Sequence, residues 1–206
     1  ETLSSFLSSI DKLNELRIIG GEPLLNTAVY DLIEYAYLSG KVNDIVIYTN
    51  ATILPAEDQF NRLTKVPNLT FKLSDYGPSL SRKADRLTQQ LKRMSIAYIR
   101  EPIEIWTDSG TITQHSRTTS QLKEVFGQCC VNDAFTILHD KLYICPFSAN
   151  LHNLDPTTYS HVEHLLIDKT APHILRVRIS DFINKHKYLA ACNNCNGRDH
   201  NVTKVK

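Results

Sequence analysis

Short apolar runs alternate with amphipathic stretches through the first half of the chain. The apolar runs have the length of buried strands and occupy residues 16–19, 45–48, 69–73 and 96–99. Between them, apolar residues recur every three or four positions, as on the buried face of a helix, over residues 23–36, 55–63 and 84–94. Strands that alternate with helices in this way predict a parallel sheet covered by helices on at least one face, and therefore an α/β fold.

An amphipathic pattern is also present at the very start of the chain. Apolar residues at positions 3, 6, 7, 10 and 13 step by three and four, which predicts a helix. The chain begins with Glu1 rather than methionine, and no strand pattern precedes this helix. We therefore interpret the chain as a fragment that starts at the first helix of its parent protein.

The pattern changes after residue 100. Residues 101–125 are rich in Ser, Thr and other polar residues, and they predict a strand followed by a connecting segment. Residues 126–206 contain two short apolar stretches on either side of His139-Asp140-Lys141, which predict a β-hairpin, and a helical pattern over residues 181–191. The sequence thus predicts an α/β domain at residues 1–100, a connection, and a small cysteine-rich domain made of a hairpin and a helix.

Small polar and acidic residues follow three of the predicted strands. Parallel strands end at one edge of a sheet, where ligands of α/β proteins bind. Glycines at that edge allow a ligand to approach the backbone, a carboxylate can accept from an ammonium group, and small polar groups suit ribose hydroxyls. The alternative is plain turn chemistry, because Asn, Ser and Asp favour turns without any ligand. The candidate residues are Gly20, Gly21, Glu22, Pro23, Thr49, Asn50, Ser74 and Asp75.

The five cysteines form a second candidate site. They are Cys129, Cys130, Cys145, Cys192 and Cys195, and the last two form a C-x-x-C motif. Thiolates are soft ligands, and a short C-x-x-C loop together with thiols from a separate hairpin can surround a tetrahedral zinc ion or an iron-sulfur cluster. Either site has four places, so we expect only one of Cys129 and Cys130 to take part. The alternative is a set of inert buried thiols.

Charge and hydropathy narrow the class of protein. The 206 residues include 23 Lys and Arg against 22 Asp and Glu, a formal net charge of +1, which argues against a dedicated DNA or RNA binder. No apolar stretch approaches the roughly 18 to 20 residues that cross a bilayer, so no membrane partner is expected. The first residues also lack the pattern of a signal peptide, and we expect a cytoplasmic protein. In that compartment cysteines serve more often as ligands or catalytic groups than in disulfides.

Taken together and in this order, the motifs resemble those of the radical S-adenosylmethionine (SAM) enzymes. Gly20-Gly21-Glu22-Pro23 is similar to the motif at the second barrel strand of that family, which contacts the methionyl amino group of the cofactor. Thr49-Asn50 is similar to the Thr-Asn-Gly of the third strand, with Ala51 in place of glycine. Ser74 and Asp75 resemble the polar group of the fourth strand, which lies near the cofactor ribose.

The cysteine region resembles the auxiliary-cluster domains, called SPASM or twitch domains, of some members of this family. The predicted hairpin ending in Cys145-Pro146 and the Cys192-Asn193-Asn194-Cys195 motif are similar to that scaffold, although Asp140 stands where the family usually has glycine. The resemblance implies a partial (β/α) barrel at residues 1–100, a connection at 101–125, and a twitch-like domain at 126–206 that binds one auxiliary 4Fe-4S cluster.

The resemblance also implies an activity. Enzymes of this family cleave SAM reductively to a 5′-deoxyadenosyl radical, which abstracts hydrogen from a substrate. Their partners here would be SAM, an electron donor and a peptide, protein or sugar-like substrate, and no residue is identified as catalytic. The C-x-x-x-C-x-x-C loop that holds the SAM-cleaving cluster is absent, so this chain alone is expected to be inactive. A second hypothesis is a zinc-stabilised α/β binding module whose four-cysteine site is structural.

Overall fold

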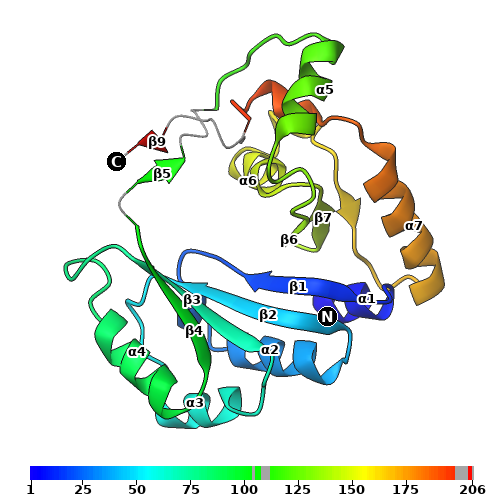
Figure 1. Ribbon diagram of the computed structural model, residues 1–206. Helices are drawn as coiled ribbons and strands as arrows, with labels where there is room; N and C mark the ends of the chain where they lie inside the picture. The colour runs from blue at the N-terminus through cyan, green and yellow to red at the C-terminus, as the bar shows by residue number, and fades with distance from the viewer. Residues whose placement is uncertain (104, 108–111, 198–203, 206) are drawn as a thin grey trace. The chain divides into compact units, whose positions relative to one another are not determined.

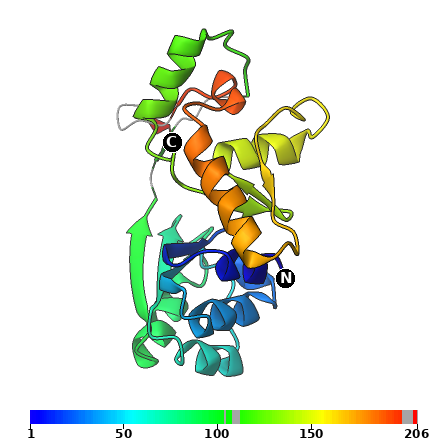
Figure 2. The ribbon, with the colours of Figure 1, turned by 90° about the vertical axis from the view of Figure 1, so that its right-hand side faces the viewer.

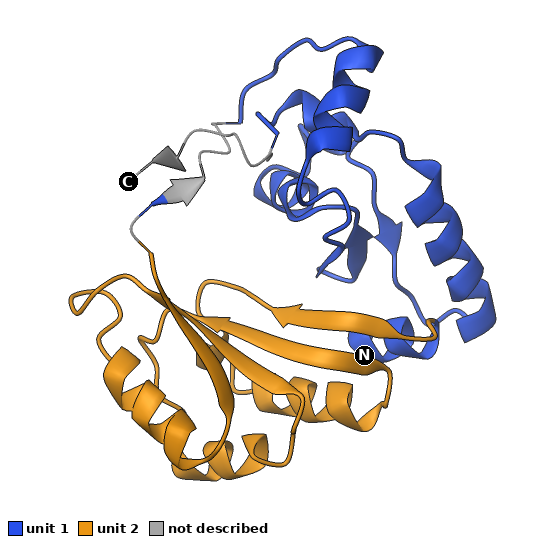
Figure 3. Ribbon diagram, viewed as in Figure 1, with its two compact units in different colours: residues 1–9, 105–206 blue, residues 10–104 orange. Residues whose placement is uncertain are grey.

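A computed structural model of the chain describes residues 1–103, 105–107, 112–197 and 204–205. These residues divide into two compact units, one formed by residues 10–104 and the other by residues 1–9 together with 105–206 (Figure 3). The first helix of the chain thus belongs to the same unit as the cysteines. Each unit is described below by itself.

Residues 10–104 form an α/β unit around a four-stranded parallel sheet in the order β1-β2-β3-β4 (Figure 1). Its strands are β1 (Leu13–Ile18), β2 (Val42–Thr49), β3 (Leu69–Asp75) and β4 (Ala97–Pro102). The short 3-10 helix η1 (Pro23–Leu25) and three α-helices connect them, namely α2 (Val29–Leu38), α3 (Glu57–Leu63) and α4 (Ala84–Arg93). The three α-helices lie against one face of the sheet, so the α/β fold with a parallel sheet is confirmed.

The core of this unit lies between the sheet and its helices. Ile45 and Ile47 of β2 and Phe71 of β3 are fully buried, and the residues that alternate with Phe71 along β3 are partly exposed. This alternation arises because successive side chains of a strand point to opposite faces of the sheet. Buried apolar residues of the three helices complete the core, including Ile33, Phe60, Leu63, Leu87 and Leu91.

Two predicted element boundaries near the start of the chain are wrong. The first helix, α1 (Thr2–Ser8), ends before Leu13, which was expected to extend its apolar stripe but begins β1 instead. The backbone N–H of Leu13 donates to the carbonyl oxygen of Lys41, so pairing with the neighbouring strand decides its conformation. Pro23 begins η1 and not α2, which begins only at Val29. Just before α2, the side-chain oxygen of Asn26 accepts from the N–H of Ala28.

The second unit contains, among its described residues, α1, four further helices and two small antiparallel sheets. Its helices after α1 are α5 (Thr119–Gln128), α6 (Pro146–Leu154), α7 (Pro172–Lys185) and the 3-10 helix η2 (Ala190–Asn193). Its sheets are β6-β7-β8, made of Thr136–Leu138, Lys141–Tyr143 and Leu165–Leu166, and β5-β9, made of Trp106–Thr107 and Lys204–Val205. No helix within the described ranges is long and apolar enough to span a membrane.

The predicted hairpin forms, with β6 and β7 joined by a two-residue turn. His139 and Asp140 both have positive φ, 47° and 60°, as a type I′ turn requires. Aspartate tolerates this left-handed conformation better than most residues other than glycine. The turn therefore closes even though Asp140 replaces the glycine of the family that the sequence resembles.

The helix expected to deliver the C-x-x-C motif is placed differently. The sequence predicts this helix over residues 181–191, whereas α7 ends at Lys185 and Cys192 lies in η2. Pro172 is the first residue of α7, the helix position that proline favours most. The sequence therefore contained a signal for the beginning of this helix. Helix α5 was also missed, although Thr118 and Gln121 form a capping box at its beginning.

Candidate functional site

Four of the five cysteines line one small cavity of the second unit. Cys129 directly follows α5 and Cys145 directly precedes α6. Cys192 lies in η2, and Cys195 is the second residue after it. Both α5 and α6 pack against η2, which brings the three segments together (Figure 2). Cys130 is exposed and does not line the cavity. The cavity encloses about 20 Å³ of open space, and its remaining lining is Val125, Phe126, Val131, Asn132, Phe147, Ala191 and Gly197.

The thiols in this cavity are held in an apolar environment. Burial raises the pKa of Cys192 to about 12, and burial likewise raises the pKa values of Cys145 and Cys195. Backbone donors face two of the sulfurs: the N–H of Ser148 lies 3.4 Å from Cys145 Sγ and that of Gly197 lies 3.3 Å from Cys195 Sγ. Burial therefore favours the neutral form of these three thiols, while backbone donors that stabilise a thiolate face two of them.

The four thiols do not form a preassembled site for a single ion. In the part of the chain that the structure describes, no group of three or more His, Cys, Asp or Glu side chains is arranged so that it could hold a metal ion. The cysteines thus share a cavity without the close tetrahedral grouping that one zinc ion requires.

At the edge of the parallel sheet, the carboxylate of Glu22 ties the ends of two strands together. Thr49 Oγ1 lies 2.8 Å from Glu22 Oε2 and 2.9 Å from Oε1, and the N–H of Asn50 donates to Oε2 at 3.0 Å. The N–H of Leu24 donates to Oε1 at 3.1 Å. Glu22 is 9% exposed and Thr49 is 2% exposed. Because a carboxylate has about four acceptor positions, these donors occupy most of the capacity of Glu22.

Thr49 and Asn50 also organise the turn that follows β2. Thr49 Oγ1 accepts from the N–H of Ala51, and Asn50 Oδ1 accepts from both the N–H and the hydroxyl of Thr52. Ala51 has a positive φ of 57° and is fully buried. The side chains predicted to bind a ligand here are used in turn chemistry, which was the alternative interpretation of this motif.

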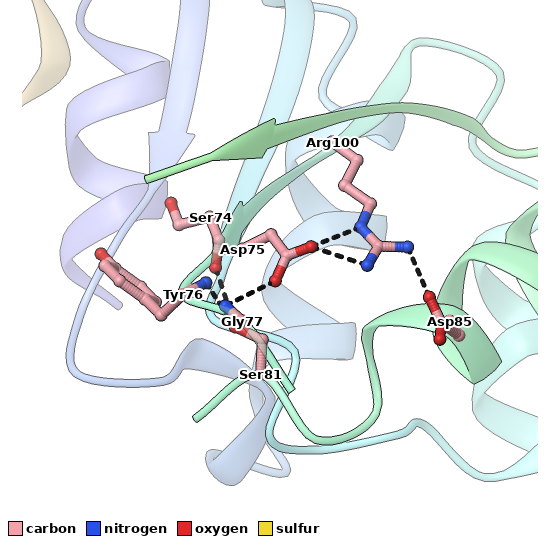
Figure 4. Close-up of polar contacts among 7 residues, drawn as sticks. All are labelled: Ser74, Asp75, Tyr76, Gly77, Ser81, Asp85 and Arg100. Carbon is pink, nitrogen blue, oxygen red and sulfur yellow. Dashed lines mark hydrogen bonds and ion pairs between the residues drawn. The ribbon is translucent and has the colours of Figure 1, made fainter. Parts of the chain in front are cut away.

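The end of β3 is held by an ion pair that the sequence did not indicate. The carboxylate of Asp75 accepts from the N–H of Gly77 at 2.9 Å and from Nε of Arg100 at 2.7 Å, and Arg100 also contacts Asp85 at 2.7 Å (Figure 4). The N–H of Gly77 and, after it, the guanidinium of Arg100 lower the pKa of Asp75. Ser74 contributes its carbonyl oxygen, which accepts from the Ser81 hydroxyl at 3.2 Å.

Three of the candidate residues at this edge remain open to a ligand. A Cβ atom added at Gly20 or at Gly21 would meet nothing within 4 Å, so the space beside this turn is free. The hydroxyl of Ser74 points away from the Asp75–Arg100 pair and makes no hydrogen bond to the other residues drawn in Figure 4. Pro23 is buried and starts η1, so it shapes the turn. The backbone at residues 20–21 and the Ser74 hydroxyl are thus open groups at this edge.

The structure brings the candidates together in two places. Glu22, Thr49 and Asn50 are in direct contact at the sheet edge, and Asp75 is engaged separately by Arg100. The partners missed by the sequence analysis, Arg100 and Ser81, come from other segments, and no local pattern points to them. A scan against protein-family models finds no match for the chain, and a search of curated proteins finds no matching relative.

Proposed function

We propose that this chain is part of a radical SAM enzyme, in which residues 10–104 form a partial (β/α) barrel and the cysteine-bearing unit holds one auxiliary iron-sulfur cluster. The observation that carries the proposal is the convergence of Cys129, Cys145, Cys192 and Cys195 on one cavity from three segments far apart in the chain. Cys130, the one thiol in excess of a four-ligand site, is exposed.

The composition of the cavity fits an iron-sulfur cluster. Four thiols are the donor set of a 4Fe-4S cluster, and hydrogen bonds to the sulfurs are one means by which proteins tune such clusters. The N–H groups of Ser148 and Gly197 supply two of these bonds. A cluster holds its thiolates around its own iron and sulfide atoms, and therefore farther apart than a single zinc ion does.

Binding of a cluster requires the cavity to widen. Its open space of about 20 Å³ is close to the room that one water molecule needs. We propose that Phe126 and Phe147, which line the cavity, turn outward when the thiolates bind. Binding also releases the thiol protons, because metal-bound cysteine is a thiolate.

At the sheet edge, the open backbone supports a SAM site at the turn after β1. The family resemblance assigns the methionyl amino group to Gly20-Gly21-Glu22-Pro23. Because internal donors already engage the Glu22 carboxylate, we propose that the ammonium group contacts strand-end carbonyls near Gly20 and Gly21, and that Glu22 holds the turn in place. The hydroxyl of Ser74 is then available to the ribose.

In this family, bound SAM supplies a 5′-deoxyadenosyl radical for hydrogen abstraction once an electron donor has reduced the adjacent cluster. For this chain we propose that the barrel residues position SAM and exclude water around it. The proposed substrate class is that of the family members with auxiliary clusters, a peptide, protein or sugar-like molecule.

A zinc-stabilised binding module is the second candidate function. The small open volume of the cavity favours it, since one ion needs less room than a cluster. In this case the four cysteines would have to close further around the ion, and the metal would contribute to the stability of the second unit only.

The metal content of anaerobically purified protein tests the proposal. Reconstitution with iron and sulfide should yield a brown protein with about four iron and four sulfide per chain. Single Cys-to-Ser changes at Cys129, Cys145, Cys192 and Cys195 should each lower the iron content, whereas Cys130→Ser serves as the matched control and should retain it. A colourless protein with one zinc would favour the module, and protein that binds neither metal would contradict both functions.

The coding sequence upstream of Glu1 provides a separate test of the family. The proposal expects a C-x-x-x-C-x-x-C segment there, and a polypeptide extended to include it should convert SAM to 5′-deoxyadenosine under reducing conditions. If the extended polypeptide holds an auxiliary cluster but never cleaves SAM, the family assignment fails while the cysteine site stands.

A further inference from the structure

A short segment before α5 runs beside the C-x-x-C motif and bonds its backbone. The N–H of His115 donates to the carbonyl oxygen of Asn193 at 2.8 Å, and the N–H of Arg117 donates to Asn193 Oδ1 at 2.8 Å. Asn193 is the first residue between Cys192 and Cys195. Residues 115–117 therefore hold the middle of the motif, from a position more than seventy residues away in the chain.

The side chain of Arg117 also contacts the backbone of the C-x-x-C motif. Its Nη1 atom donates to the carbonyl oxygen of Cys195 at 2.6 Å and to the carbonyl oxygen of Cys192. Nη1 carries two hydrogens, so one nitrogen can bridge the carbonyls of both cysteines. The planar guanidinium fixes the two carbonyls relative to each other, and with them the backbone from which both thiols extend into the cavity.

Among the described residues, the guanidinium of Arg117 contacts two neutral carbonyl oxygens and takes part in no ion pair. Arg117 is half-buried, which limits the screening of its charge by solvent. A positive charge at this place favours thiolates over thiols and favours the more negative, reduced form of a cluster bound to them.

We propose that Arg117 is a positioning residue of the four-cysteine site: it sets the spacing of Cys192 and Cys195, and its charge raises the reduction potential of the cluster that they hold. The inference rests on the proposed function for its redox part. Its geometric part requires only that the motif binds a metal or presents its thiols in a fixed arrangement.

Two substitutions separate geometry from charge. Arg117→Lys keeps the charge but lacks the planar fork that bridges two carbonyls, and Arg117→Met removes both. In the reconstituted chain we expect Arg117→Met to shift the midpoint potential to more negative values and to release iron to a chelator several-fold faster. Arg117→Lys should release iron faster while its potential stays near that of the parent. Lys123→Met, which removes an exposed charge from α5, is the matched control and should change neither quantity.

The rate of thiol alkylation tests the geometry without any metal. In a Cys130→Ser background, which removes the exposed thiol, Arg117→Lys keeps the charge that favours thiolates and should increase the alkylation rates of Cys192 and Cys195 several-fold while circular dichroism stays unchanged. If the parent binds no iron, the proposed function fails and the redox part with it, but faster alkylation still supports the positioning role. Unchanged alkylation in folded Arg117→Lys, together with unchanged chelation and potential in folded Arg117→Met, would overturn the inference.

Discussion

The hydroxyl of Thr49 donates to the carboxylate of Glu22 at the edge of the parallel sheet, with 2.8 Å between Thr49 Oγ1 and Glu22 Oε2. Thr49 is the last residue of β2, and Glu22 lies in the turn that follows β1. The contact thus joins the ends of two neighbouring parallel strands. A carboxylate that the sequence alone suggested as a ligand for an ammonium group is, in the folded chain, a structural link between strand ends.

The first prediction concerns this contact. Glu22→Ala leaves the buried Thr49 hydroxyl, the buried N–H of Leu24 and the partly buried N–H of Asn50 without an acceptor, and should lower the free energy of unfolding by on the order of 3 kcal/mol. Glu22→Gln keeps one acceptor oxygen and should cost less. Urea unfolding of both variants measures the effect, with Thr49→Val and the double variant completing a mutant cycle. A coupling energy near zero between the two positions would show that the contact carries no stability.

The second prediction separates SAM binding from folding at Gly21. The space beside this residue is open and its φ is not positive, so Gly21→Val should alter stability by less than about 1 kcal/mol. In a polypeptide extended upstream of Glu1, the same change should weaken SAM binding at least tenfold by calorimetry, because the side chain fills the approach to the backbone.

Gly127→Val is the matched control for this prediction, since the space beside Gly127 in α5 is equally open. The control should leave SAM binding at the level of the parent. Equal affinity in Gly21→Val would mean that the turn after β1 does not contact the cofactor.

The third prediction uses a buried hydroxyl. Tyr30 of α2 is 1% exposed, and its hydroxyl finds no hydrogen-bond partner among the described residues. Burial, followed by the charges of Asp58 and Glu22, raises the pKa of Tyr30 to about 12. Because the pKa in the folded state lies above the usual value of 10.0, the neutral phenol favours folding below pH about 10, and this contribution is lost as the pH rises towards about 12.

Between pH 10 and pH 12, the free energy of unfolding of Tyr30→Phe should therefore fall less than that of the parent. At neutral pH it should be higher than that of the parent by about 1 kcal/mol, because the variant buries no hydroxyl without a partner. Denaturant titrations at several pH values measure both effects. Tyr37→Phe, on the exposed side of the same helix, is the control and should follow the parent. A large loss of stability in Tyr30→Phe would point to a hydrogen bond of this hydroxyl.

The fourth prediction concerns Asp75 and its acid sensitivity. The Gly77 N–H and the Arg100 guanidinium lower the pKa of this carboxyl group, so its contribution to stability is present above its usual pKa of 3.8 and is lost as the pH falls through the lowered value. Asp75→Asn should lower the free energy of unfolding by about 1 kcal/mol at pH 7 and by less at pH 2. A penalty that is the same at both values would contradict the ionic origin of the contact.

Local patterns in the sequence determined the α/β part of this protein to a large extent. The apolar runs around Ile47 and Phe71 specify strands, and the amphipathic stretches between the runs specify helices. Each pattern involves residues no more than four positions apart, so it can be recognised from the sequence. The same holds for the hairpin, since its turn at His139-Asp140 requires only two residues that tolerate positive φ. The clustering of cysteines in the last third of the chain and the C-x-x-C spacing likewise indicated a possible site, because both are properties of the sequence alone.

Tertiary structure decided the use of those residues. Two partners of Glu22, Thr49 and Asn50, lie 27 and 28 residues away at the end of the next strand. Arg117, which contacts the backbone of the C-x-x-C motif, lies more than seventy residues away from it. Which of two adjacent cysteines faces the cavity depends on where α5 ends and how it packs against η2: Cys129 faces it, while Cys130 is exposed. Local periodicity carries no information on such contacts, because they form only when distant segments are brought together by the burial of their apolar faces.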